Sequence, residues 1–454
     1  MKLKPYPEYK ESGVPWLGKV PGHWEVLRNK YLLKELDDRS ATGDEELLTV
    51  SHYTGITKRR SRLTNDNELL TNASSLVGYK KVKPNNFVMN IMLAWNGSQG
   101  TSPYSGIVSP AYCVFSVNEK KLSPKYLHFL HRSPFYTAIF KTASTGVIES
   151  RLRLYPEQYF RLPTAFPPLK EQTQIARFLD HKSSQISRFI LAKKRMMELL
   201  KEQKQAIIND AVTGKIDVRT GKPYPKYKES SVEWLGKVPE EWEVRKIKHI
   251  AKMKSGDSIT SMSIEDKGEY PVYGGNGLRG YYSKFTHDGE FLLVGRQGAL
   301  CGNIHYVSGK FWASEHAVVT TVITDCSKKW FYYLLTTMNL NQYSESAAQP
   351  GISVEKIQNL RTLYPPKEEQ FLIVTLIEKN IVNLDLAISR AEREISLIQE
   401  YRTRLIADVV TGKVDVRDIV VPETAEEDII EADSTEDAIE PVEEEVAEPA
   451  EGQE

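Results

Sequence analysis

The side chains best suited to chemistry in this 454-residue chain are basic and amide groups set among glycines. They occur in four short stretches, KRRSR (58–62), WNGSQG (95–100), GNGLRG (275–280) and GRQG (295–298). The candidates are Lys58, Arg59, Arg60, Arg62, Asn96, Ser98, Gln99, Asn276, Arg279, Arg296 and Gln297. Basic runs neutralise phosphates, and arginine and glutamine can read guanine and adenine edges where glycine lets the backbone approach. Each candidate taken singly also has a structural interpretation, and KRRSR also fits a solvated loop.

The spacings that catalysis, cofactors or metals need are not found. GNGLRG formally matches the dinucleotide pattern G-x-G-x-x-G, but aromatic YYSKF follows where that fold needs a helix to begin. No Ser/His/Asp arrangement stands out, and no His/Cys cluster has metal spacing. We therefore expect no catalytic residue, no cofactor site and no metal site in this chain.

Charge is distributed very unevenly along the chain. Residues 418–454 hold 16 Asp and Glu and no Lys or Arg, and this composition predicts a disordered acidic tail. The other 417 residues hold 60 basic and 44 acidic side chains, a net charge of +16. Such a body favours polyanionic partners, with nucleic acid the usual one, although a solvated basic surface also fits.

Cysteine usage and hydropathy indicate the compartment. The three cysteines, Cys113, Cys301 and Cys326, are widely spaced, which argues against a disulfide framework and fits a reducing environment. The first residues, MKLKPYPEYK, lack an apolar signal region, and no stretch approaches the length of a membrane span. We expect a cytoplasmic protein with no membrane partner.

These candidate residues are positioned by segments that the chain repeats. DAVTGKIDVR (210–219) and DVVTGKVDVR (408–417) are identical at eight of ten positions. The segment 4–30 matches 222–248 at 19 of 27 positions, and FPPLKEQTQI (166–175) matches YPPKEEQFLI (364–373) more weakly. The chain is thus two half-molecules with similar frames around dissimilar inserts.

The repeats divide the chain into seven segments. They are a leading segment at 1–30, a first insert at 31–165, a long helix with its exit at 166–219, a second leading segment at 220–248, a second insert at 249–363, a second long helix with its exit at 364–417, and the tail at 418–454. Both inserts combine short strand-like runs with turn residues, which predicts irregular, mostly β domains.

Each stretch after Pro-Pro has the apolar spacing of a long helix with a heptad seam. The seam residues are Leu179, Ile186, Ile190, Met197, Leu200 and Ile207 in the first helix, and Ile377, Ile381, Leu384, Ile388, Ile395, Ile398 and Leu405 in the second. Helices of about 40 residues would be roughly 60 Å long. We expect the two to pair as an antiparallel intramolecular coiled coil with pseudo-two-fold symmetry; the alternative is that each packs only on its own insert. Gly214 and Gly412 are expected to end them.

The combination of these features resembles the specificity subunit of type I restriction–modification systems. KESGVPWLGKVPGHWEV and its duplicate, the Pro-Pro-x-x-Glu-Gln helix starts and the TGK decamers are similar to that family's repeated segments, over residues 4–417. The resemblance implies an α+β fold in which two target-recognition domains are separated by two long antiparallel helices, in a circular arrangement. The acidic tail is not part of the family's pattern.

The resemblance also implies a function. The chain would bind double-stranded DNA without catalysis, each insert reading half of a bipartite, asymmetric sequence. Two modification subunits would carry S-adenosylmethionine and methylate adenine, and restriction subunits would use ATP and Mg²⁺ to translocate and cut DNA. The main alternative is a coiled-coil adaptor that joins proteins without DNA; an enzyme reading is more distant.

Overall fold

The computed structural model describes residues 3–58, 75–148, 151–230, 232, 235–298, 300–344 and 351–422. The chain divides into two compact units, and the boundaries between the units fall within the two long helices. Unit 1 contains residues 1–194 and 392–454, and unit 2 contains residues 195–391. Each unit therefore combines one insert with parts of both helices.

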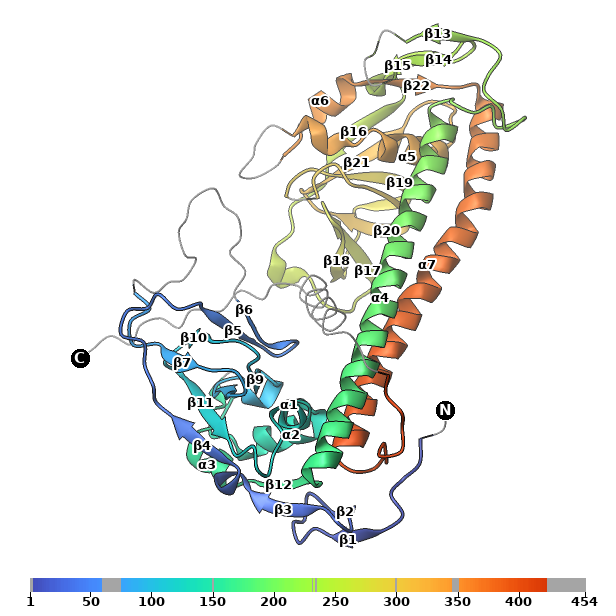
Figure 1. Ribbon diagram of the computed structural model, residues 1–454. Helices are drawn as coiled ribbons and strands as arrows, with labels where there is room; N and C mark the ends of the chain where they lie inside the picture. The colour runs from blue at the N-terminus through green and yellow to red at the C-terminus, as the bar shows by residue number, and fades with distance from the viewer. Residues whose placement is uncertain are drawn as a thin grey trace, which may run out of the picture. The chain divides into compact units, whose positions relative to one another are not determined.

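The long helices are α4 (Leu169–Val212) and α7 (Lys367–Val410), each of 44 residues. They run antiparallel (Figure 1), which confirms the prediction. In unit 1, Lys193 Nζ lies 2.7 Å from Glu394 Oε2, and in unit 2, Lys204 Nζ lies 2.6 Å from Asp385 Oδ1. Residue numbers therefore increase along α4 in the direction in which they decrease along α7, as in an antiparallel pair.

The predicted seam is the buried stripe of these helices. All thirteen seam residues are buried or half-buried, as a heptad repeat requires when two helices share one face. Near the end of α4, Ile208 is more deeply buried than the predicted Ile207, which is half-buried. The charged side chains Lys193 and Lys204 lie beside the seam and pair across it.

A joint at the start of each long helix is built from the repeated segments. In unit 1 the Glu171 carboxylate accepts hydrogen bonds from the Tyr6 hydroxyl at 2.7 Å and the Trp24 indole N–H at 3.0 Å. His23 Nε2 lies 2.7 Å from its other oxygen. Tyr6, Trp24 and Glu171 are all buried. The Pro-Pro-x-x-Glu-Gln motif is thus structural, because its glutamate holds the leading segment on the helix.

The same joint recurs in unit 2. Glu369 accepts hydrogen bonds from the Tyr224 hydroxyl and, at 3.0 Å, from the Trp242 indole N–H. The glutamines that follow the two glutamates also act alike: Gln172 Oε1 accepts from Ser123 N–H at 2.7 Å, and Gln370 Oε1 from Ser327 N–H at 2.8 Å. Both glutamines are fully buried and tie an insert helix to the start of a long helix.

Glycine closes each long helix, as the decamers predict. Gly214 and Gly412 have φ of 71° and 77°, the left-handed conformation that ends helices. A Cβ on Gly412 would lie 2.6 Å from Cδ of Pro21, and one on Gly214 would lie 2.6 Å from Cγ of Pro239. Each helix end therefore touches a leading segment of its own unit.

Replacing Gly412 with alanine is expected to loosen this contact strongly. The added Cβ would overlap the Pro21 ring in a backbone conformation that L-residues avoid, so we expect a loss of at least ~1–2 kcal/mol in unit 1. Thermal unfolding of Gly412→Ala beside Gly221→Ala checks it. Gly221 has φ of 69° but no atom within 4 Å of its Cβ position, so it reports backbone strain alone. Equal losses in both variants would contradict the steric contact.

The two ends of the repeated pattern meet in unit 1. Asp415 N–H donates to the Lys4 carbonyl at 2.8 Å, forming an antiparallel bridge, and the Tyr9 hydroxyl donates to the Gly412 carbonyl at 3.0 Å. The exit of the second helix thus returns to the first leading segment, which confirms the predicted closure of the chain.

The insert of unit 1 is built around a four-stranded sheet in the order β4-β11-β8-β9. Alternate residues bury its two faces: Phe87 and Met89 join one core, whereas Val88 joins another. From the first leading segment through this insert, the strands and helices are β1 (Tyr9–Glu11), β2 (Lys19–Pro21), β3 (Glu25–Arg28), η1 (Asn29–Tyr31), β4 (Leu33–Leu36), β5 (Leu48–Ser51), β6 (Gly55–Lys58), β7 (Lys80–Val82), β8 (Phe87–Asn90), η2 (Ala94–Asn96), β9 (Gln99–Thr101), β10 (Gly106–Val108), β11 (Tyr112–Val117), α1 (Pro124–Arg132), α2 (Pro134–Ala143), α3 (Pro156–Arg161) and β12 (Pro163–Phe166).

The insert of unit 2 has a six-stranded sheet in the order β16-β21-β19-β20-β17-β18, in which only β17 and β20 pair in parallel. Leu292 and Val294 face the main core and Leu293 a smaller one. From the second leading segment through this insert, the elements are β13 (Tyr227–Glu229), β14 (Lys237–Pro239), β15 (Glu243–Lys246), η4 (Ile247–His249), β16 (Ala251–Ser255), η5 (Ser261–Ser263), β17 (Tyr270–Gly274), β18 (Gly277–Tyr282), β19 (His287–Gly295), β20 (Ile304–Ala313), β21 (Ala317–Val322), α5 (Lys328–Thr337), η6 (Leu340–Tyr343), α6 (Val354–Asn359) and β22 (Arg361–Tyr364).

One short ladder joins the two ends of each insert. In unit 1, β3 pairs antiparallel with β12, and in unit 2, β15 pairs antiparallel with β22. The strand that leads into an insert is thus hydrogen-bonded to the strand that leads out of it. The fold confirms the α+β prediction of two different, mostly β domains with two long antiparallel helices.

Candidate nucleic-acid interface

The four candidates of unit 2 lie at one place on its sheet. Asn276 is exposed in the β17–β18 turn, and Arg279 is exposed on β18. Arg296 and Gln297 directly follow β19. A Cβ added to Gly275 would lie 3.4 Å from the Gln297 carbonyl oxygen and 3.6 Å from the Arg296 nitrogen. The turn therefore rests against the Arg296–Gln297 step.

Hydrogen bonds constrain the polar side chains of this cluster. One guanidinium nitrogen of Arg296 donates to Ser255 Oγ at 3.2 Å, and Arg296 is half-buried. Gln297 is exposed, and its Oε1 lies 2.9 Å from Nδ1 of His316. Ser255 and His316 were not among the sequence candidates. They occupy the end of β16 and the residue before β21, and only their position at strand ends could have indicated them.

Unit 1 presents Asn96 but not its neighbours. Asn96 is exposed at the end of η2, as expected for a group that reaches a ligand. Ser98 and Gln99 are 2% and 0% exposed, and Gln99 Nε2 donates to the His131 carbonyl at 2.7 Å. The prediction that these two side chains face DNA does not fit this structure, because β9 lies beneath α1 and their burial makes them internal supports.

Lys58 lies at the exposed end of β6. Its ammonium group is 2.8 Å from Glu46 Oε2 and 5.4 Å from the centre of the Tyr104 ring, so its charge is partly balanced. The other basic candidates of this stretch, Arg59, Arg60 and Arg62, lie outside the described residues.

Two further features of unit 1 lie beside Asn96. Arg132 donates to the carbonyls of His52 and Tyr53 and so holds the β5–β6 turn, where Tyr53 is 41% exposed. Lys141 lies 5.3 Å from the centre of the Trp95 ring. A Cβ on Gly97 would lie 3.7 Å from the His52 carbonyl oxygen, which places the β5–β6 turn next to η2. An aromatic group and a cation thus flank Asn96, and the sequence pattern did not single them out.

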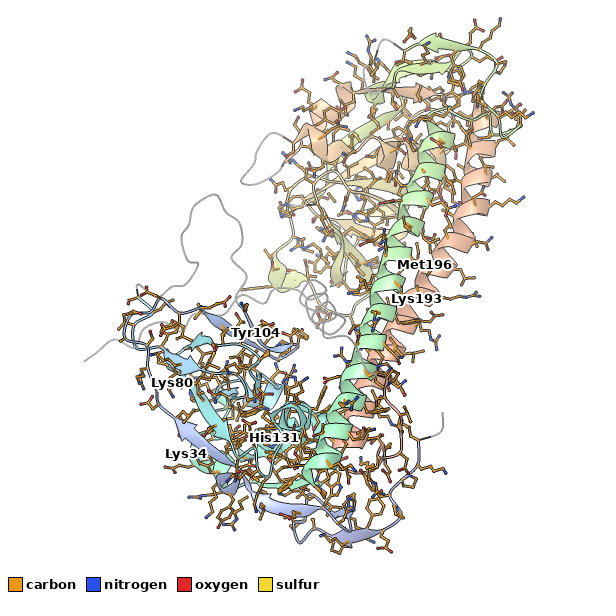
Figure 2. All side chains as sticks on the ribbon, viewed as in Figure 1. Lys34, Lys80, Tyr104, His131, Lys193 and Met196 are labelled. Atoms are coloured by element: carbon orange, nitrogen blue, oxygen red, sulfur yellow. The ribbon has the colours of Figure 1, made fainter. Side chains whose placement is uncertain are left out.

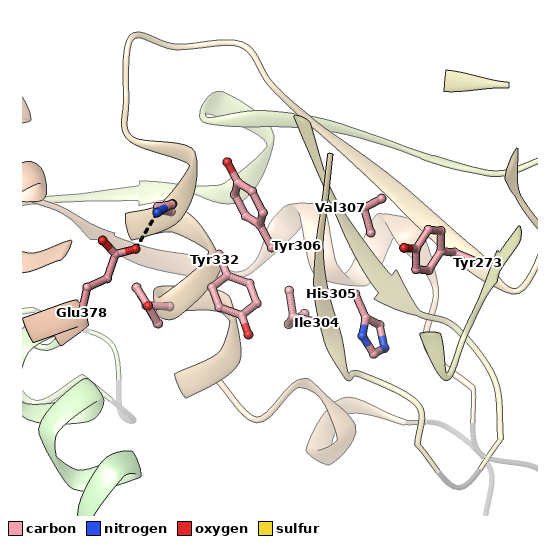
Figure 3. A pocket seen from close by; sticks show the side chains of 9 residues that line it. Tyr273, Ile304, His305, Tyr306, Val307, Tyr332 and Glu378 are labelled. Atoms are coloured by element: carbon pink, nitrogen blue, oxygen red, sulfur yellow. Dashed lines mark hydrogen bonds and ion pairs between the residues drawn. The ribbon is translucent and has the colours of Figure 1, made fainter. Parts of the chain in front are cut away.

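Unit 2 also contains a pocket of about 420 Å³ (Figure 3). Lys329 Nζ and Glu378 Oε1, 2.6 Å apart, form an ion pair in its wall. A Cβ on Gly277 would lie 3.1 Å from the His305 ring, so the pocket adjoins the β17–β18 turn. It is lined by Tyr273, Ile304, His305, Tyr306, Val307, Lys329, Tyr332, Tyr333 and Glu378. These residues contain no serine, threonine or cysteine that a base could activate.

The described ranges hold no group of three His, Cys, Asp or Glu side chains placed as metal ligands. Cys113 and Cys301 are buried and Cys326 is half-buried; burial raises the pKa of the Cys113 thiol to about 12. None of the helices that the structure describes has the length and apolar character needed to span a membrane.

Comparison with known proteins shows which proteins this chain is similar to. Residues 239–392 match the family model described as "Type I restriction modification DNA specificity domain". The chain is similar to the Type I restriction enzyme EcoprrI specificity subunit of Escherichia coli, 46% identical over 134 residues that make up 29% of this chain and 33% of that protein. The match spans about a third of the length of the first curated relatives.

Two likenesses extend along nearly the whole chain. The Type I restriction enzyme MjaVIII specificity subunit of Methanocaldococcus jannaschii is 22% identical over 434 residues, which cover 88% of this chain and 95% of that one. In fold, the chain is similar to one from a solved structure described as "Structural basis underlying complex assembly and conformational transition of the type I R-M system". The TM-score is 0.59 at 13% identity, covering 87% of this chain and 99% of that chain. These matches support the resemblance to type I restriction–modification specificity subunits that the doubled frame and the two different inserts indicate.

Proposed function

We propose that this chain binds double-stranded DNA as the specificity subunit of a type I restriction–modification complex. In the proposal each unit reads one half of a bipartite, asymmetric target. The observation that carries it is the joint built twice, by Glu171 in unit 1 and by Glu369 in unit 2, in units whose main sheets differ in strand number and order. Two equivalent joints that carry two different inserts fit a DNA target whose two halves differ in sequence.

The charge of the body supports a phosphate-binding component. Residues 1–417 carry a net charge of +16, and contacts from Lys and Arg to phosphates give binding that weakens as salt rises. The exposed amide and guanidinium groups of Asn96, Asn276, Arg279 and Gln297 are the candidates for base edges. Phosphate contacts would position the chain, and these groups would select the sequence.

The proposal assigns the chemistry to partner subunits in the cytoplasm. Two modification subunits would dock on the two copies of the frame, bind S-adenosylmethionine and methylate adenine in each half-site. Restriction subunits would use ATP and Mg²⁺ to translocate and cut DNA. This chain would supply recognition and spacing, without catalytic residues of its own.

Exchanging one insert is expected to change one half of the methylated sequence. Replacing residues 31–162 with the corresponding segment of another specificity subunit keeps β12 and its ladder with β3. Genome-wide mapping of N6-methyladenine, in cells with and without the gene, should show one gapped motif that depends on it. The exchanged chain should keep one half of that motif and alter the other.

The matched control exchanges residues 249–360, which spares β22 and should alter the other half only. A change in both halves after either exchange would contradict two independent readers. Methylation that does not depend on the gene would favour the alternative function, an adaptor that joins proteins without DNA.

A further inference from the structure

Main-chain hydrogen bonds fix the Arg296–Gln297 step of unit 2 from two sides. Arg296 N–H donates to the His316 carbonyl at 2.9 Å, and Ile352 N–H donates to the Arg296 carbonyl at 3.1 Å. Gln297 itself forms an antiparallel bridge with Gly351. Because neighbouring segments hold the backbone on both sides, the exposed Gln297 side chain extends from a fixed backbone position.

A second contact fixes the far end of the same side chain. Gln297 Oε1 lies 2.9 Å from Nδ1 of His316, and because a carboxamide oxygen only accepts, Nδ1 carries the proton and donates. Nε2 of His316 lies 3.3 Å from Glu315 Oε1. A ring that carries a hydrogen on each nitrogen can donate to Gln297 Oε1 and to this carboxylate at the same time. The three side chains form a short chain of contacts at the edge of the sheet.

We infer that His316 is a positioning residue that sets which way the Gln297 carboxamide faces; the inference rests on the proposed DNA-reading function. A carboxamide has an acceptor and a donor end of nearly equal size, and a freely turning one can present either. With Oε1 held by His316, the Nε2–H group is directed away from the ring. Gln297 then offers a donor, which suits an acceptor on a base edge such as N7 of a purine.

The surroundings of Gln297 agree with this role. Asn276 lies in the turn that rests on the Arg296–Gln297 step, Arg279 lies on the adjoining strand β18, and both are exposed. Arg296 is partly occupied by Ser255, which leaves Gln297 as the exposed polar side chain with a defined orientation at this step. The orientation of one amide would thus decide one position of the half-site that unit 2 reads.

Two substitutions of similar size separate this role from a merely structural one. The amide of asparagine can place a donor where Nδ1 of histidine lies, whereas aspartate places an acceptor there. His316→Asn should keep the base preferred at that position. His316→Asp should turn the Gln297 amide so that Oε1 faces outward, which favours a base-edge donor such as N4 of cytosine. His316→Ala should reduce discrimination there by about 10-fold or more, since a good base contact is worth ~1–3 kcal/mol.

The experiment maps N6-methyladenine in cells that carry the complete system with each variant in the full-length chain. The half-site read by unit 1 is an internal control for folding and assembly, and His249→Ala, an exposed histidine of the same unit, is the matched control. Asparagine and aspartate variants that behave alike, or three variants that leave every position unchanged, would overturn the inference. A wild-type chain that directs no gapped motif would instead overturn the proposed function, and this inference with it.

Discussion

Unit 1 is expected to lose stability steadily as the pH falls from about 6.5 toward 3, mainly because of one buried histidine. His131 lies at the end of α1 (Figure 2) and is 0% exposed. Its Nδ1 is 2.9 Å from the Tyr159 hydroxyl and its Nε2 is 3.2 Å from the Thr164 hydroxyl. Burial lowers the pKa of His131 from 6.5 to about 3.

The direction follows from proton binding by the two states. Above pH 6.5 neither state is protonated at His131, so its contribution to stability is fully present. Between pH 6.5 and about 3, His131 is protonated in the unfolded chain but stays neutral in the folded chain. The free energy of unfolding should fall by about 1.4 kcal/mol per pH unit, on the order of 4 kcal/mol over the window. Burial also lowers the pKa of His128, which acts in the same direction.

Hydrogen exchange of unit 1 peptides across this pH range would measure the slope after correction for the intrinsic rates. His131→Leu is the informative variant, because the equivalent position of unit 2, counted from the caps Ser123 and Ser327, holds the buried Leu335. We expect a less stable protein at neutral pH with a shallower slope below 6.5, since two hydroxyls lose a partner while the titrating group is removed. An unchanged slope in His131→Leu would assign the pH dependence elsewhere.

Trp24→Ala and Trp242→Ala are each expected to destabilise one unit by about 3–5 kcal/mol. Both side chains are fully buried, and each indole N–H donates to a buried glutamate at 3.0 Å. The Trp24 ring also backs Gly412, where a Cβ would lie 3.2 Å from its Cη2 atom. Truncation removes the packing, leaves a cavity and takes a hydrogen-bond donor from Glu171.

The loss should be local, and this distinguishes it from general unfolding. In Trp24→Ala, hydrogen exchange should accelerate in residues 3–30 and 392–422, both within unit 1, while the leading segment 222–248 stays protected. Trp242→Ala should show the reverse. Tyr31→Ala, which removes an aromatic side chain that is 58% exposed, should change neither. Equal acceleration in both units after a single substitution would mean that the joints are not independent.

The frame could be predicted because its signals are local and written twice. The heptad seam depends on spacing within one segment, and each decamer shows its helix-ending glycine directly. The joint was harder to predict from the sequence, because Glu171 contacts Tyr6 and Trp24, which lie 165 and 147 residues away along the chain. All three residue types nevertheless recur in the second copy, and that pairing was a usable signal.

Individual contact residues were harder to predict because exposure depends on tertiary packing. Ser98 and Gln99 follow a glycine, as an open loop would, yet α1 covers β9 and buries them. His316 was missed for the opposite reason, since it precedes an ordinary apolar strand and gains its interest only from Gln297 across the sheet edge. Neither outcome follows from composition or periodicity.

The ladders β3–β12 and β15–β22 have a consequence for how such a chain can evolve. Paired strands stand about 4.8 Å apart, so each insert begins and ends at nearly one point of the frame. Any domain whose first and last residues lie close together can therefore be inserted between these two strands, whatever its length or topology. The ends of domains often do lie close together. Recombination could therefore replace a whole reader in one event while the joints at Glu171 and Glu369 keep their geometry. A new DNA specificity would then arise by exchange of a whole insert, and it would not require a series of mutually compatible point mutations.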